Sequence, residues 1–165
     1  MPTINGRACV VNGTPVDKVF SDGRQVYGRN LLAGVDRTIH QATGWFQWIA
    51  NIERKFIKVG EPLCFSALIN NAPHAGELVQ GNACCAMQAK DVSGKVILEK
   101  DGNTISFDAD GISQVSMVVP NETDAIQIFI VNNNSSMLQN PYYGYPKVEF
   151  GNVATPWTPA PEDVM

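Results

Sequence analysis

The alternation of apolar and polar residues predicts a chain built mostly from short β-strands. Three segments alternate clearly, residues 63–69, 113–119 and 125–131, as strands with one buried face do. Further strands are expected at residues 54–57, 82–90, 95–99, 103–107 and 145–150. Turn sequences separate them, such as Lys100-Asp101-Gly102, and no helical period is visible. The pattern therefore predicts an all-β protein, an antiparallel β-sandwich.

The first 26 residues read as a separate arm. Val16–Phe20 and Arg24–Tyr27 flank Ser21-Asp22-Gly23 as a β-hairpin, and Asn5-Gly6 and Asn12-Gly13 predict two more turns. A single hairpin is barely stable in water. We therefore expect residues 1–26 to form an arm for attachment or oligomerisation that leans on the main domain or a neighbour, with a mobile leader as the alternative.

The strand pattern also assigns the faces of the sheets. Ile126, Ile128 and Ile130 are expected in the core, which turns Gln127 and Phe129 outward. By the same reasoning, the outward-facing residues of the other strands are Gln114 and Ser116, Cys64 and Ser66, and Gln88 with Lys90. If these sets share one sheet, they combine amides, hydroxyls and one aromatic ring, which suits sugar binding. The alternative for Phe129 is that a loop covers it.

Two aromatic groups add to this surface. Trp45, Phe46 and Trp48 form the densest aromatic segment, and Trp45 and Trp48 lie on opposite sides of a strand, so both cannot be in the core. Tyr142 and Tyr143 fall in a predicted Pro- and Gly-containing loop, where rings can be presented to a ligand at low entropic cost. Both groups are expected either to stack on a ligand or to serve as ordinary packing anchors.

Composition narrows the choice of partner. The 165 residues carry 17% charged side chains and a net charge of −4, which disfavours a nucleic-acid partner because phosphate binding needs a basic surface. No run of residues is long and apolar enough to cross a membrane, and the first residues do not predict a signal peptide. A polar surface with few charges suits a neutral ligand.

The four cysteines lack the spacing of a zinc or redox site, and neighbours Cys84 and Cys85 point to opposite faces. Reduced, buried thiols are expected. His40 and His74 are placed in loops without catalytic context, and the aspartates lie mostly in turns, so no catalytic residue is named. Residues 108–111 resemble the start of a calcium loop without its later ligands. A plain turn is expected there.

The end of the chain holds its most specific pattern. In the strand at 145–150, Val148 and Phe150 alternate with Lys147 and Glu149, which predicts a strand with one buried face. Prolines after residue 155 then prevent further strand pairing. Trp157 is expected to fold back over an open end of the core, and residues 158–165 to form a stiff exit tail that points elsewhere.

Two motifs carry a family resemblance. Lys147-Val148-Glu149-Phe150-Gly151, followed by residues 154–163, resembles the closing signature of carbohydrate-binding-module-like domains from tail and baseplate proteins of phages and prophages of Gram-positive bacteria, especially lactobacilli. Val26-Tyr27-Gly28-Arg29-Asn30-Leu31-Leu32 resembles the entry to the same domain. The resemblance covers about Tyr27 to Asp163 and implies a jelly roll of the galactose-binding type over residues 27–157.

The resemblance implies a non-catalytic domain of a phage tail that recognises host cell-wall saccharide, made in the bacterial cytoplasm and carried in the virion with other tail proteins. The alternative is a structural virion protein that uses the jelly roll for protein contacts, and a hydrolase is the third. Related modules often hold a structural calcium, but no full ligand set maps onto this sequence, so no metal ligand is named. The residues expected to contact sugar are Trp45, Trp48, Tyr142, Tyr143, Phe129, Gln127 and Gln88.

Overall fold

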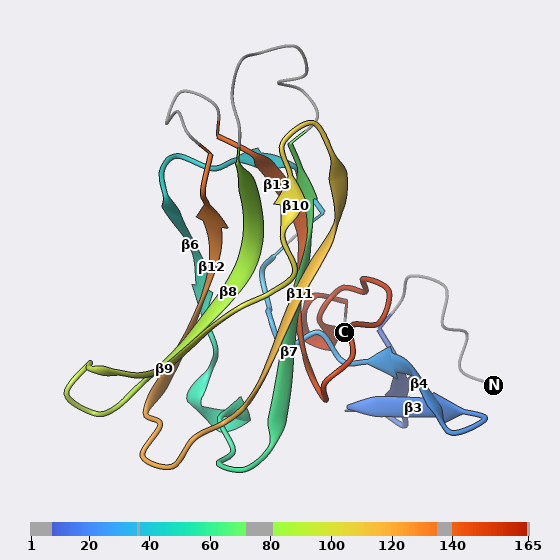
Figure 1. Cartoon of the computed structure of the whole chain (residues 1–165). Helices are drawn as coiled ribbons and strands as arrows, with labels where there is room; N and C mark the ends of the chain where they lie inside the picture. Colours follow the sequence, from blue (N-terminus) through green and yellow to red (C-terminus); the bar gives the residue numbers. More distant parts are fainter. Residues whose placement is uncertain (1–7, 36, 72–80, 135–139, 165) are drawn as a thin grey trace.

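Two antiparallel sheets packed face to face form the body of the protein (Figure 1). The computed structural model describes residues 8–35, 37–71, 81–134 and 140–164. The first sheet, called the β8 sheet, has the strand order β10-β8-β12-β6, with β9 also paired to β8. Its strands are β6 (Phe46–Asn51), β8 (Asn82–Lys90), β9 (Val96–Asp101), β10 (Ile105–Ser106) and β12 (Ala125–Asn132).

The second sheet, called the β7 sheet, has the order β11-β7-β13-β5. Its strands are β5 (His40–Gln41), β7 (Pro62–Asn70), β11 (Asp110–Val118) and β13 (Tyr142–Phe150). Most connections cross from one sheet to the other, as in a jelly roll. The predicted all-β antiparallel sandwich is confirmed.

The core lies between the two sheets, where the predicted inward faces meet. Ile126, Ile128 and Ile130 are fully buried, as are Phe65 and Ile69 on the opposing sheet. Leu31 and Leu32, at the predicted start of the domain, join the same core. The sequence pattern therefore identifies the core-facing residues of the long strands correctly.

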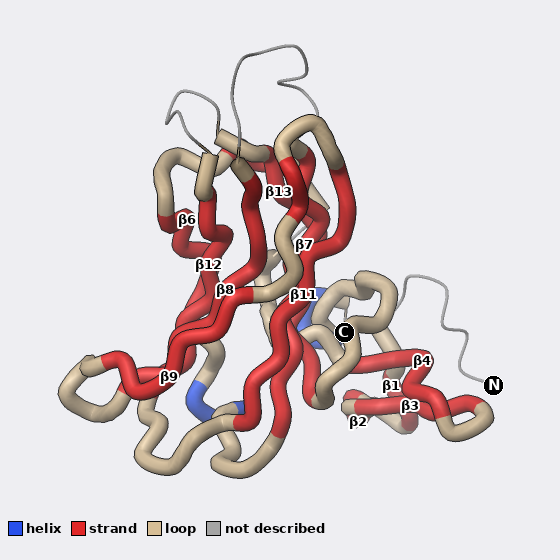
Figure 2. Tube along the Cα trace, viewed as in Figure 1, coloured by secondary structure: helices blue, strands red, loops and turns tan. Residues whose placement is uncertain are grey.

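The N-terminal arm consists of two hairpins, β1–β2 (Val10–Val11 and Thr14–Pro15) and β3–β4 (Lys18–Ser21 and Arg24–Gly28). Asn12 and Gly13, like Asp22 and Gly23, have positive φ, as the tight hairpin turns require. Figure 2 shows the arm standing beside the β7 sheet, with the C-terminal segment between the two. The turn predicted at Asn5-Gly6 lies outside the described residues.

The C-terminal segment folds back over the outer face of the β7 sheet and covers two charges. Lys147 and Glu149 are fully buried there, so the expectation that only one face of this strand is covered is wrong. The Lys147 Nζ donates to Thr155 Oγ1 and to the Pro156 carbonyl, both at 2.8 Å, and lies 3.6 Å from Glu149 Oε1. Glu149 accepts from the backbone N–H and the hydroxyl of Thr155, both at 2.8 Å.

The arm also forms hydrogen bonds to Thr155 and Glu149 of this buried cluster. The N–H of Gly28 donates to Thr155 Oγ1 at 3.1 Å, and the Gln25 amide donates to Glu149 Oε2 at 3.3 Å. A Cβ at Gly28 would lie 1.7 Å from Glu149 Oε2, so only glycine allows this approach. Burial raises the pKa of Glu149 and lowers that of Lys147, and the opposite charge of each partner works against that shift.

The proline-rich tail also stays on the domain. Thr158, Ala160 and Pro161 are buried, and the Asn30 side chain donates to the Thr158 carbonyl at 3.0 Å. The prediction that this segment points elsewhere is therefore wrong. Trp157 folds back as expected but lies on the outer face of the β7 sheet instead of over an end of the core, and its Nε1–H donates to the Pro146 carbonyl at 3.1 Å.

Several strand predictions are corrected. Residues 54–56 form a 3₁₀ turn, Arg54–Phe56, in which Phe56 N–H bonds to Glu53 O and only Phe56 is buried. Lys100 and Asp101 are not in a turn between β9 and β10. Both of those strands pair with the same edge of β8, and Gly102 N–H continues the ladder to the Cys85 carbonyl.

Two polar segments predicted as loops contain strands. Residues 34–43, expected to be irregular, contain β5, so His40 lies in a short strand. His74 is outside the described residues. Tyr142 and Tyr143 begin β13, where they pair with Asn70 and Ile69 of β7. Within the described ranges no helix is long and apolar enough to span a membrane.

The thiols are expected to resist modification in the folded protein. All four cysteines are free and buried, and burial raises the pKa of Cys64 to about 12 and that of Cys84 to about 11, so little thiolate forms at neutral pH. Ellman's reagent should react slowly with the native protein and fully after denaturation. A control cysteine at the exposed Thr104 should react at once. Rapid reaction of the native wild-type chain would contradict this burial.

The buried ion pair gives a second prediction. Lys147→Met or Glu149→Leu alone leaves one charge buried without its partner, so each should lower the free energy of unfolding by about 3–5 kcal/mol. The double variant should cost clearly less than the sum of the two, because no unpaired charge remains. Urea unfolding of the four proteins measures the cycle. Simple additivity would show that the two charges do not depend on each other.

Candidate functional site

Two neighbouring rows of side chains cross the outer face of the β8 sheet. In the first row, Gln127 of β12 lies between Asn51 of β6 and Gln88 of β8. In the second, Phe129 lies between Trp48 and Ala86. Directly opposed side chains on one face of an antiparallel sheet touch or nearly touch. We call the surface made by Phe46, Trp48, Asn51, Gln88, Gln127 and Phe129 the aromatic–amide face.

The rings of this face are open to solvent. Phe46 is 57% exposed and Trp48 51%. The rings of Phe46 and Phe129 meet edge to face, with centroids 6.4 Å apart and an interplanar angle of 88°. The small cluster of Cys84, Ala86 and Val131 is buried and packs against Phe129. The rings therefore stand on a packed base while keeping free surface for a ligand.

An irregularity in β6 sets the composition of the aromatic–amide face. Ile128 pairs with Ala50, whereas Phe129 pairs with Trp48, so Ile49 is an extra residue in the register. Such a bulge changes which side chains share a face. It places Trp48 and Asn51 on the same side although they are three residues apart, and the Trp48 Nε1–H lies 3.3 Å from Asn51 Oδ1.

The two glutamines of the face differ in their hydrogen bonding. The Gln88 amide donates to Glu99 Oε2 at 2.5 Å, on the β9 side of the face. The half-buried side chain of Gln127 makes no hydrogen bond to any residue that the structure describes. An amide beside exposed rings can donate to and accept from a ligand hydroxyl group. Asp101, opposite Ala86, adds an exposed carboxylate at the same edge.

The structure brings together four of the seven residues predicted to contact sugar: Trp48, Phe129, Gln127 and Gln88. Trp45 is 55% exposed but lies just before β6, where its carbonyl accepts from Asn132 N–H. Trp45 stands in the bend before the strand, and no ring contact among the described residues joins it to Phe46, Trp48 or Phe129. It is therefore not part of the aromatic–amide face.

Tyr142 and Tyr143 belong to the β7 sheet and are not part of the aromatic–amide face. Tyr143 pairs with the inward-facing Ile69 and packs partly against the core, and burial raises its pKa. Its ring lies 5.7 Å from that of His40, between centroids. Tyr143 is consequently a packing residue at the β5 edge, and Tyr142 lies beside it on the same strand.

The outward-facing polar residues do not share one sheet, contrary to one expectation from the sequence. Gln88 and Gln127 lie on the β8 sheet, whereas Gln114, Ser116 and Ser66 lie on the β7 sheet. Cys64 and Ser66 are also buried, because the C-terminal segment covers part of that face. The amide groups beside Phe129 come from β6, β8 and β12 alone.

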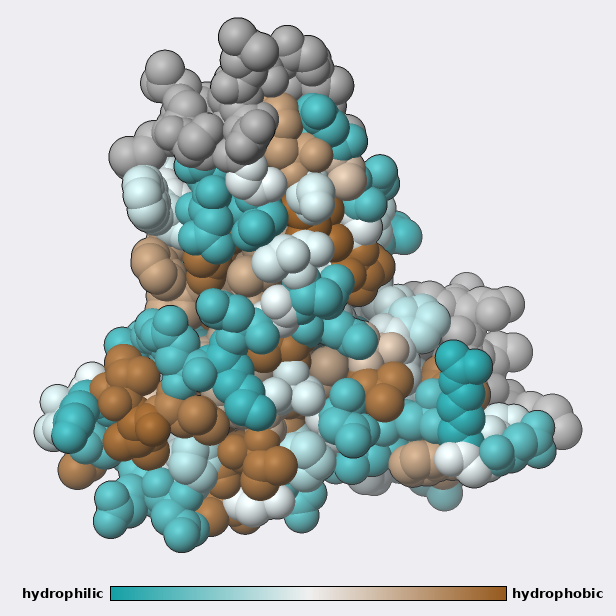
Figure 3. Space-filling view, viewed as in Figure 1, coloured by the Kyte–Doolittle hydropathy of each residue, from teal (hydrophilic) through white to brown (hydrophobic). Residues whose placement is uncertain are grey.

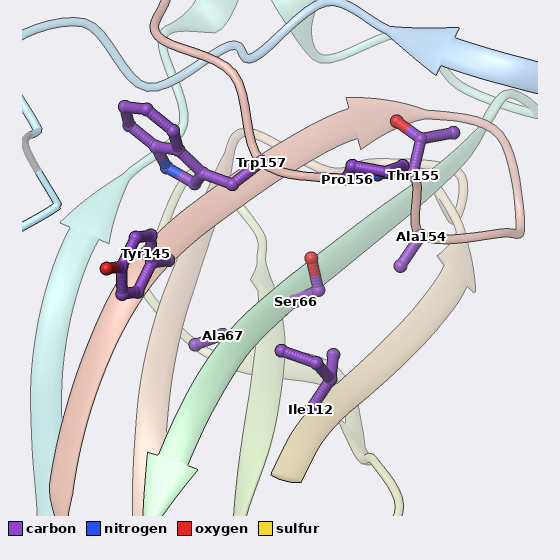
Figure 4. Close-up of a pocket in the computed structure, with 8 residues that line it drawn as sticks. All are labelled: Ser66, Ala67, Ile112, Tyr145, Ala154, Thr155, Pro156 and Trp157. Carbon is purple, nitrogen blue, oxygen red and sulfur yellow. The ribbon is translucent and has the colours of Figure 1, made fainter. Parts of the chain in front are cut away.

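The outer face of the β7 sheet contains a hollow of about 280 Å³. Figure 4 shows Tyr145 and Trp157 at one end, Ala154 and Thr155 at the other, and Ser66 on the strand beneath. The Tyr145 and Trp157 rings meet edge to face, with centroids 6.1 Å apart. Sequence analysis missed this site, because Trp157 was expected to cover an open end of the core and Tyr145 to begin the strand at 145–150.

A third exposed apolar region lies along β9. Figure 3 shows hydrophobic residues gathered over this strand, where Val92 and Val96 are exposed. These side chains are aliphatic, and flat rings for stacking are found on the two other surfaces. Among the described residues, no group of three or more His, Cys, Asp or Glu side chains could hold a metal ion.

No protein-family model and no curated protein matches the sequence. The fold is similar to that of the xylan-binding CBM22-1 domain of Paenibacillus barcinonensis Xyn10C, at 10% identity and a TM-score of 0.47, over 70% of each chain. A family 22 carbohydrate-binding module of Clostridium thermocellum Xyn10B is 14% identical, with a TM-score of 0.45 over 69% of each chain.

Bacteriophage CBA120 tailspike protein 4 is similar over 68% of this chain and 15% of its own, at 10% identity and a TM-score of 0.42. These similarities concern the path of the chain through the sandwich. At such identities they do not indicate which side chains of this protein meet a ligand, and that assignment depends on its own exposed rings and amides.

Proposed function

We propose that this protein is a non-catalytic saccharide-binding domain and that sugar binds at the aromatic–amide face. The observation that carries the proposal is the row of exposed Trp48 and half-buried Phe129 beside Gln127, whose amide has no partner among the described residues. A pyranose ring offers apolar C–H groups to the aromatic rings and hydroxyl groups to the amides. Glu99 and Asp101 at the β9 edge add acceptors for further hydroxyl groups.

We further propose that the saccharide belongs to a bacterial cell wall and that the protein is part of a phage or prophage tail, made in the host cytoplasm and assembled with other tail proteins. The entry and closing motifs of the sequence support this setting. Single-site affinity should be weak, since an open face buries little ligand surface. Several copies in one tail, as a homo-oligomer, would raise the avidity.

A second candidate, a structural virion protein that binds other proteins, is favoured by the arm. Phe20 and Val11 are exposed on the two hairpins. Apolar side chains on a projecting arm suit contact with another protein. This role is compatible with sugar binding at the aromatic–amide face, because the arm lies on the side of the β7 sheet.

The test compares two equally exposed tryptophans. Trp48→Ala removes a ring from the aromatic–amide face and should weaken binding to purified Gram-positive cell walls, or to a responsive glycan on an array, by about tenfold or more. Trp45→Ala is the matched control and should bind like the wild type. Gln127→Ala should weaken binding without lowering the thermal unfolding temperature.

Two outcomes would count against this assignment. If Trp48→Ala and Trp45→Ala lose saccharide binding equally, binding is not specific to the aromatic–amide face, because Trp45 lies outside it. A wild-type chain that binds no wall preparation but assembles tightly with a tail protein would favour the structural role.

A further inference from the structure

The hollow between Tyr145 and Trp157 is shaped by an unusual backbone position. Tyr145 has φ of 53°, a left-handed conformation that bulky residues rarely adopt. The register with β7 slips here, since Gly144 pairs with Leu68 but Lys147 with Ser66, which leaves Tyr145 and Pro146 opposite a single residue. A bulge of this kind redirects side chains. Tyr145 is consequently 36% exposed on the outer face, against the hollow.

The other ring of the hollow is held in place from several sides. Trp157 donates its Nε1–H to the Pro146 carbonyl at 3.1 Å, and the Arg37 guanidinium lies 5.8 Å from its ring centroid. Trp157 also borders a second hollow, of about 370 Å³, that includes Arg37 and Asp163 in its lining. Rings fixed before binding lose little conformational entropy when a ligand arrives.

The lining limits the class of ligand. Every residue around the hollow is uncharged, which disfavours phosphate or other ionic groups. Ser66 is paired with β11 on one side and β13 on the other, so a peptide strand finds no free sheet edge there. What remains is a small space with two rings and the hydroxyl group of Ser66. Its volume is near the lower end for small-molecule pockets.

We propose that this hollow is a second saccharide site that takes one neutral pyranose unit of a glycan. The proposal extends the proposed function, on which it rests only for the cell-wall origin of the glycan. The two sites lie on the outer faces of opposite sheets, so one domain would hold two glycan segments at once. The expected effect is avidity for a dense wall that neither site gives alone.

The experiment follows the indole N–H signals of the full chain by ¹H–¹⁵N NMR, with the three tryptophans assigned through Trp45→Phe and Trp48→Phe. Methyl glycosides of glucose, galactose, rhamnose and N-acetylglucosamine are titrated in turn. At least one should shift the Trp157 signal to saturation. Tyr145→Asn, which suits the positive φ, should weaken that binding about tenfold, whereas Tyr145→Phe should retain it.

Trp48→Ala separates the two proposals, because it should leave the Trp157 titration unchanged. If a saccharide shifts the Trp157 signal and none shifts the Trp48 signal, the proposed site at the aromatic–amide face is rejected and the second site is retained. A Trp157 signal that no saccharide moves overturns the second site, as does a Tyr145→Asn variant that binds like the wild type with unchanged thermal unfolding. A stronger response to a proline-rich peptide than to any saccharide would likewise reject it.

Discussion

The buried Lys147–Glu149 pair under Thr155 is the interaction on which the arrangement of the chain depends. A buried carboxylate and ammonium cost free energy unless their remaining hydrogen bonds are made. Here Thr155, the Pro156 carbonyl and Gln25 make them. The C-terminal segment cannot leave β13 without exposing the pair, and the arm cannot shift without opening the close contact of Gly28. One small group of polar atoms thus fixes both ends of the domain.

This covering makes the two outer faces of the sandwich different. The β7 sheet carries the arm and the C-terminal segment, and hollows lie beside that segment. On the β8 sheet, Phe46 and Trp48 remain open. A broad stacking surface therefore exists on one side, and a narrow recess between rings exists on the other.

The sequence predicts the sandwich and its core because strand alternation is a local property, visible in Ile126, Ile128 and Ile130. It also identifies Phe129 and Gln127 as neighbours on the outward side of one strand. Which strands flank them depends on sheet order, which no local pattern contains. The bulges at Ile49 and Tyr145 change the face of every residue beyond them. The burial of Lys147 depends on the C-terminal segment, which folds back over β13 from later in the chain. The polarity of the residue alone predicts an exposed side chain.

The entry and closing motifs recognised in the sequence meet in space, where Asn30 bonds to the Thr158 carbonyl and to Val148 N–H. Both motifs lie on the β7 side of the sandwich, so the two outer faces of the molecule are not equivalent. A partner that binds the arm would contact the domain on its β7 side and would leave the exposed rings of the β8 sheet facing solvent. This orientation requires no hinge, because hydrogen bonds hold both ends of the domain on the same sheet of the sandwich.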